Sequence, residues 1–112
     1  RLPALVPLLK RMVTADSFHR RDREEKELAI AMLAQDGGDA ATATLGELLL
    51  AKVRLAAPRQ SETRRLAAEG LAHIRTVGAR RLLKQAASSL QPGLRKAARD
   101  ALELAEGRRH GG

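Results

Sequence analysis

Apolar residues recur at every third or fourth position along most of the chain, which is the spacing that places them on one face of an α-helix. Short polar stretches and Pro or Gly residues interrupt this pattern and divide the 112 residues into six segments. The β-branched and aromatic residues that favour strands are scarce. The sequence therefore predicts an all-α domain over residues 1–106, with helices at about 2–14, 22–35, 40–56, 61–75, 78–90 and 93–106, and a disordered tail at 107–112.

The apolar faces of these segments give the expected core. Leu and Ala supply most of it, because the chain has one Phe and no Trp or Tyr, and such a core requires helices that approach closely. The expected inward residues are Leu5, Leu8, Leu9, Met12, Val13, Leu28, Ala29, Met32, Leu33, Leu45, Leu48, Leu49, Val53, Leu66, Ala67, Leu71, Ile74, Ala79, Leu82, Leu83, Ala86, Ala97, Ala98, Ala101, Leu102 and Ala105.

The breaks between the segments contain residues that favour helix ends. Gly37 and Gly38 can both adopt the positive φ angles that stop a helix, and Asp39 is expected to cap the helix that follows. This stretch therefore predicts a tight corner between two helices. Pro58 is expected to close the third helix, and Ser61 to cap the fourth.

Three segments of the sequence can be aligned as an internal repeat. KELAIAMLA, RRLAAEGLA and RKAARDALE superimpose when Ala29, Ala67 and Ala98 are matched, which gives separations of 38 and 31 residues. A different second helix follows the first two units at nearly the same offset, with Leu45 corresponding to Leu82. Periods of this length are typical of helix pairs joined by short turns.

The unit LAQDGGDAATATLGELL, residues 33–49, resembles the turn of HEAT repeats, in which a first helix ends in leucine and small residues before a Gly-Asp corner. The next unit, RTVGARRLL from Arg75, lacks the Gly-Asp pair and is one residue shorter. The resemblance implies an armadillo-like α-α superhelix of helical hairpins, whose second helices line the concave side and bind protein partners.

The search for catalytic and metal sites gives no assembled set of residues. The absence of Cys excludes disulfides and Cys-ligated zinc, and the three His residues lie on three different segments. Glu69 and His73, four apart, are interpreted as a solvated ion-pairing face and not as half of a metal site. We therefore expect no enzyme activity, no cofactor and no metal.

Phe18 lies in the long polar connection DSFHRRDREE, residues 16–25, and has two possible roles. It could be the anchor of a recognition loop, because an isolated exposed aromatic residue often starts a contact. The favoured interpretation is that it packs between helices and fixes the connection.

Basic residues give the main functional indication. The formal net charge is +8, and residues 76–112 carry eight basic and three acidic side chains. We expect the second-helix row to present one basic surface to an acidic protein partner, formed by Lys10, Arg11, Arg54, Arg80, Arg81 and Lys84. A second basic cluster, Arg95, Lys96 and Arg99, is expected on the outer row or at the C-terminal end.

Two alternative functions remain open. The basic face could bind duplex nucleic acid nonspecifically, whereas single strands are disfavoured because stacking requires aromatic residues. The chain could also self-assemble through apolar residues of its terminal helices, with Leu2, Leu5, Leu102 and Leu104 as candidates.

The setting of the protein can also be anticipated. No membrane-spanning run and no signal-peptide pattern occurs, so we expect a soluble cytoplasmic protein with no membrane partner. The composition, rich in Ala, Arg, Leu and Gly, and the start at Arg1 without Met favour a module of a larger bacterial protein.

Overall fold

Helices account for most of the computed structural model, which describes residues 5–54 and 56–110, with side chains for all of these except 108–110. The elements are α1 (Leu5–Thr14), the 3₁₀ helix η1 (Asp16–Arg20), α2 (Arg23–Asp36), α3 (Asp39–Leu50), α4 (Pro58–His73), α5 (Val77–Ala87) and α6 (Pro92–His110). No strand occurs within the described ranges, so the predicted all-α fold is confirmed.

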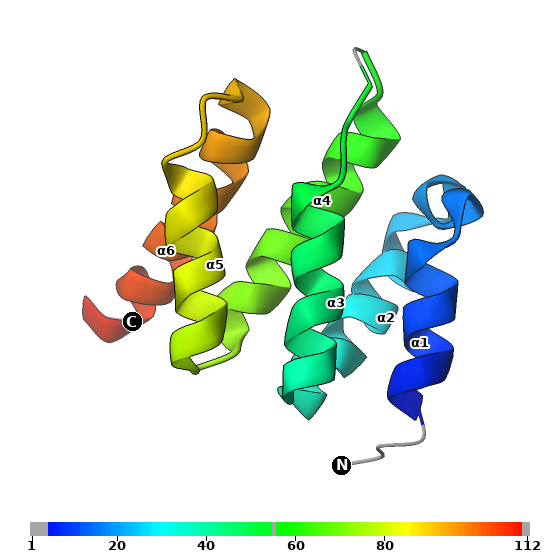
Figure 1. Ribbon diagram of the computed structural model, residues 1–112, viewed down its shortest axis with the longest axis horizontal. Coiled ribbons are helices and arrows are strands. Elements are labelled where there is room, and N and C mark those ends of the chain that lie inside the picture. The colour runs from blue at the N-terminus through cyan, green and yellow to red at the C-terminus, as the bar shows by residue number, and fades with distance from the viewer. Residues whose placement is uncertain (1–4, 55, 111–112) are drawn as a thin grey trace.

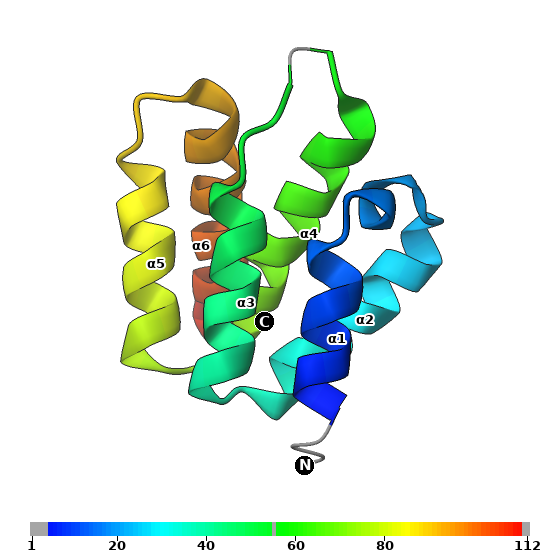
Figure 2. The same cartoon turned by 45° about the vertical axis from the view of Figure 1, so that its right-hand side comes forward.

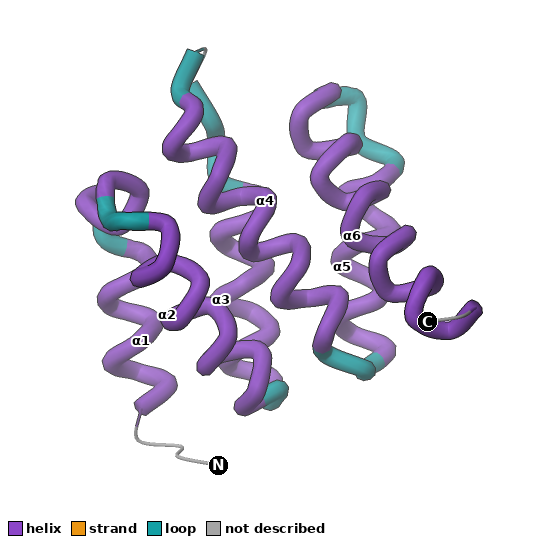
Figure 3. Tube along the Cα trace, turned by 180° about the vertical axis from the view of Figure 1, so that it is seen from behind, coloured by secondary structure: helices purple, strands orange, loops and turns teal. Residues whose placement is uncertain are grey.

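The helices lie in two rows of three. Helices α1, α3 and α5 form the front row in Figure 1, and α2, α4 and α6 form the row seen in front when the molecule is viewed from behind in Figure 3. The chain crosses from one row to the other at each connection, as the turned view in Figure 2 also shows. The repeat-aligned residues Leu33 and Leu71 therefore lie on neighbouring helices of the same row, α2 and α4.

The core fills the space between the two rows. Its largest fully buried apolar side chains include Phe18, Leu33, Leu45, Leu71 and Leu83. The predicted packing of Phe18 inside the fold is confirmed, because its side chain is completely buried within η1. The polar connection between α1 and α2 is thus fixed to the core by its one aromatic residue.

Close approach of helices is most marked at Gly70 in α4. A Cβ atom at this position would lie 2.8 Å from Cγ2 of Ile30 in α2 and 3.4 Å from Cδ1 of Leu45 in α3. Real Cβ atoms do not approach neighbours as closely as 2.8 Å. The absence of a side chain at Gly70 therefore allows α4 to pack against both helices at once.

The connection between α3 and α4 differs from the prediction. Helix α3 ends at Leu50 and not near residue 56, and the described residues between α3 and α4, 51–54 and 56–57, are non-helical. Pro58 does not close α3 but occupies the first turn of α4, where its missing N–H and fixed φ are well tolerated. Ser61 is consequently inside α4 and is not its cap.

The corner between α2 and α3 matches the prediction only in part. Gly37 ends α2 with a φ of 66°, and its N–H donates to the Leu33 carbonyl at 3.1 Å. Gly38 has a φ of −81°, so one positive φ angle is enough to form the corner. Asp39 is the first residue of α3, and its side chain makes no capping bond to the helix; the residue before it, Gly38, holds the cap position.

Two further expectations are corrected. Leu8 and Leu28 were expected to face inward but are 57% and 64% exposed. The buried face of α2 is instead formed by Lys26, Ala29, Ile30 and Leu33. The expected disordered tail at 107–112 overlaps the end of α6, which continues through His110; residues 111 and 112 lie outside the described residues.

Candidate partner-binding groove

One face of α5 borders an open groove with a volume of about 1200 Å³. The end of α4, the turn that follows it and the last turns of α6 complete the lining. Helix α5 is oriented by its sequence: Ala79, Leu83 and Ala86 are buried on one side, and the charged positions between them project outward. The Thr76 hydroxyl caps the helix by accepting a hydrogen bond from the Ala79 N–H at 3.2 Å.

The groove carries an excess of positive charge. Arg75, Arg80, Arg81 and Lys84 line it, and Glu106 is the single acidic residue among its lining residues. None of the four basic side chains forms an ion pair with any residue that the structure describes. The groove therefore keeps an excess of positive charge that no ion pair within the described residues offsets directly.

Basic residues outside the groove more often form ion pairs or hydrogen bonds within the fold. The second basic cluster expected from the sequence lies on α6, where Lys96 pairs with Asp100 at 2.9 Å and Arg95 donates to the Ser89 carbonyl at 3.1 Å. On α2, Arg23 pairs with Glu27 at 3.8 Å. The ion pairs of Lys96 and Arg23 reduce the charge available for a partner, whereas the groove combines four basic residues without such pairs.

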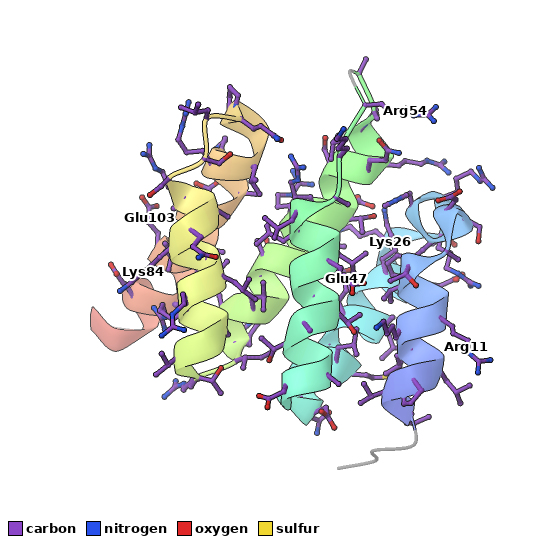
Figure 4. All side chains as sticks on the ribbon, in the orientation of Figure 1. Arg11, Lys26, Glu47, Arg54, Lys84 and Glu103 are labelled. Carbon is purple, nitrogen blue, oxygen red and sulfur yellow. The ribbon has the colours of Figure 1, made fainter. Side chains whose placement is uncertain are left out.

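The structure brings together only three of the six residues expected to form one basic surface. Arg80, Arg81 and Lys84 share the groove, whereas Arg54 lies in the connection between α3 and α4, and Lys10 and Arg11 lie on α1. Figure 4 shows Arg11 and Lys84 at opposite ends of the front row, with Glu47 of α3 between them.

Helix α3 is the reason for this separation. Its residues 39–50 include no Lys or Arg, so the middle of the front row adds no positive charge. Its exposed Glu47 lies 3.9 Å from the Lys10 ammonium group and partly neutralises it. The expected basic surface is thus divided into separate regions, of which the groove is the most highly charged.

A buried lysine, which the sequence interpretation did not identify, joins three elements. The Lys26 side chain on α2 is completely buried, and its Nζ lies 2.7 Å from Oε1 of Glu62 on α4. Nζ also donates to the His19 carbonyl of η1 at 3.1 Å, and to the Arg59 carbonyl and the Thr63 hydroxyl of α4 at 3.2 and 3.3 Å. Its position three, four and seven residues before Ala29, Ile30 and Leu33 was the available signal, because that spacing places all four on one helix face.

The groups around Lys26 have altered proton affinities. The hydrogen bond from Lys26 lowers the pKa of the Glu62 carboxyl. Burial, and then the nearby Lys26 charge, lower the pKa of the His19 imidazole. Since His19 Nδ1 lies 3.1 Å from the Thr63 hydroxyl, the polar groups around Lys26 form one connected network that links η1, α2 and α4.

A second buried cation, Arg64, ends helix α3. Its Nε donates to the Leu49 carbonyl at 3.0 Å and its Nη2 donates to the Ala51 carbonyl. These bonds satisfy carbonyl groups that a helix end leaves without partners, and the positive charge lies where the helix dipole is negative. Burial lowers the pKa of the Arg64 guanidinium, which nevertheless stays protonated at neutral pH.

The apolar residues expected to mediate self-assembly are not fully buried where the structure describes them. Leu5 and Leu102 are half-buried, Leu104 is exposed, and Leu2 lies outside the described residues. Among the residues that the structure describes, no three His, Asp or Glu side chains gather in a way that could hold a metal ion. Among the same residues, no helix is both long enough and apolar enough to cross a membrane.

Comparisons with known proteins give no match to a family model, a curated protein or a solved structure.

Proposed function

We propose that this chain is a non-catalytic protein-binding module and that the groove on α5 binds an acidic surface of its partner. The observation that carries the proposal is the set of four basic side chains around one groove without an ion pair to the described residues. A carboxylate that enters the groove would gain attraction from several cations without first displacing an internal partner.

The resemblance to HEAT repeats is part of the same proposal. It is supported by the alternation of the chain between two rows and by the contact between the repeat-aligned helices α2 and α4. In this proposal the protein is a module of a larger cytoplasmic bacterial protein. In this proposal the groove lies beside α5, a member of the second-helix row.

Charge reversal tests the proposed site. A triple variant with Arg80→Glu, Arg81→Glu and Lys84→Glu should lose binding of a fluorescein-labelled peptide of Asp and Glu residues by at least about tenfold, because attraction becomes repulsion. Fluorescence anisotropy at low salt measures the affinity, and circular dichroism should show an unchanged helix content.

The matched control carries the same change in net charge away from the groove. Arg11→Glu, Lys52→Glu and Arg54→Glu alter three exposed residues on α1 and in the connection between α3 and α4. This variant should retain most of the affinity, since only the long-range field changes. Equal losses in both triple variants would show that net charge, and not the groove, determines binding.

Nucleic acid is the alternative ligand that the same experiment distinguishes. A labelled DNA duplex titrated under the same conditions should bind more weakly than the acidic peptide. Tight duplex binding that decreases steeply with salt, together with no binding of the peptide, would replace the proposal with nonspecific phosphate binding.

A further inference from the structure

The groove on α5 combines its positive charge with three apolar lining residues, Ala72, Val77 and Ala105. We infer that the partner segment carries an apolar side chain between its carboxylates and that this side chain docks against Ala72, Val77 and Ala105. The inference rests on the proposed function of the groove and adds the chemical pattern of its ligand.

The three apolar lining residues differ in exposure. Val77, the first residue of α5, is 74% exposed, whereas Ala72 of α4 is buried and Ala105 of α6 is half-buried. All three line the groove. A larger apolar group that docks against them would remove Val77 from water.

Basic residues flank Val77 along the chain. Arg75 precedes Val77 by two residues, and Arg80 and Arg81 follow it by three and four, which places them on the same side of α5. Glu106, next to Ala105, gives the α6 side of the groove the opposite charge. The carboxylates of the ligand are therefore expected on both sides of its apolar residue and toward α5.

The size of the groove favours a chain segment over a small organic acid. Its volume of about 1200 Å³ exceeds the roughly 300–1,000 Å³ of typical small-molecule pockets. Its lining follows α5 from Val77 to Gln85 and on to Ser88. At about 1.5 Å per helical residue, that distance matches about five residues of an extended peptide.

Two labelled peptides of equal length and charge test the inference. One has Leu between flanking Glu and Asp residues, and the other has Gly at that position. Burial of one Leu side chain should make the first peptide bind the wild-type chain about tenfold more tightly in fluorescence anisotropy.

Variants of the chain locate the apolar contact. Val77→Ser should remove most of the preference for the Leu peptide and retain the salt-sensitive binding of both peptides. The matched control is Leu8→Ser, which changes another exposed apolar residue, on α1, and should keep the full preference.

The outcomes separate the inference from the proposed function. The two peptides could bind the wild-type chain with equal affinity, and both could lose binding in the Arg80, Arg81 and Lys84 triple variant. That result would overturn the proposed apolar contact and support the groove as a site for acidic ligands. An unchanged preference in Val77→Ser would also overturn the apolar contact. If neither peptide binds at low salt, both the inference and the proposed function are wrong.

Discussion

Lys26 shows how a single residue can hold the fold together with charge. A buried ammonium group is costly unless it is paired and its protons are bonded. Here four oxygen atoms, from Glu62, His19, Arg59 and Thr63, lie within hydrogen-bond distance of Nζ. The ion therefore stabilises the packing of η1 and α4 around α2, although its position resembles that of a core leucine.

Removal of this ion gives a prediction at the scale of one residue. Lys26→Met keeps the length of the side chain but leaves Glu62 and the His19 carbonyl without the Lys26 donor, so it should lower the free energy of unfolding by about 2–4 kcal/mol. Urea unfolding followed by circular dichroism measures the change.

The control for Lys26 is a lysine with an exposed partner. Lys96→Met breaks the ion pair with Asp100 on the surface of α6 and should cost less than about 1 kcal/mol. Similar costs for the two variants would contradict the structural role given to Lys26.

At the scale of elements, helix ends and helix contacts depend on residues that are distant in sequence. Helix α3 ends at Leu50, where Arg64 from α4 binds the carbonyls of Leu49 and Ala51. The residues that follow, AKVRLAA, would be acceptable in a helix by local propensity. The predicted end near residue 56 was wrong, and the group that caps the observed end comes from another helix, which local propensity does not show.

A substitution at Gly70 tests how closely α4 packs against α2 and α3. In an exposed helix, replacing Gly by Ala stabilises by up to about 1 kcal/mol. Gly70→Ala should instead destabilise by about 1–3 kcal/mol, because the new Cβ would collide with Ile30 and press on Leu45. Thermal and urea unfolding measure the effect.

Gly78 in α5 is the control position for Gly70, because nothing lies within 4 Å of a Cβ added there. Gly78→Ala should leave the stability unchanged or raise it slightly. A Gly70→Ala variant more stable than the wild type would show that α2, α3 and α4 can separate without cost.

For the whole molecule, the sequence predicted the number and type of elements better than the surface they form. Periodicity identified the six α-helices but not the 3₁₀ helix η1, and the isolated Phe18 was correctly expected inside the fold. Leu8 and Leu28 were misplaced because both lie at the border of an apolar stripe, where helical spacing alone does not separate core from surface.

The candidate site was predictable only within one helix. Arg80, Arg81 and Lys84 share a face of α5 by spacing, so their common face followed from the sequence; Arg81 and Lys84 are exposed and Arg80 is half-buried. These three residues line one groove together with Arg75, Val77 and Ala105. That arrangement depends on how α4, α5 and α6 pack against one another. The division of the six-residue surface likewise depends on which helix, α3, lies between its parts.

The stability of the whole fold should depend on pH through His19. Because its pKa is lowered in the folded state, the unfolded chain takes up a proton at a higher pH than the folded chain does. The free energy of unfolding should therefore decrease as the pH falls below the ordinary histidine value of about 6.5.

A comparison with His19→Gln, which does not titrate, measures this contribution. Urea unfolding between about pH 7.5 and 5 should show a shallower decrease for the variant, with a difference below the one-proton limit of about 1.4 kcal/mol per pH unit. Parallel curves for the two proteins would exclude His19 as the source of the acid sensitivity.

The lack of basic residues on α3 has a consequence for how the molecule meets other proteins. Residues 76–112 carry eight basic and three acidic side chains, whereas the central helix of the front row carries only acidic ones, Asp39 and Glu47. The positive charge of the protein is thus concentrated toward the end formed by α5 and α6. In the field of an acidic macromolecule the protein would rotate before collision, so that encounters begin with this end facing the partner.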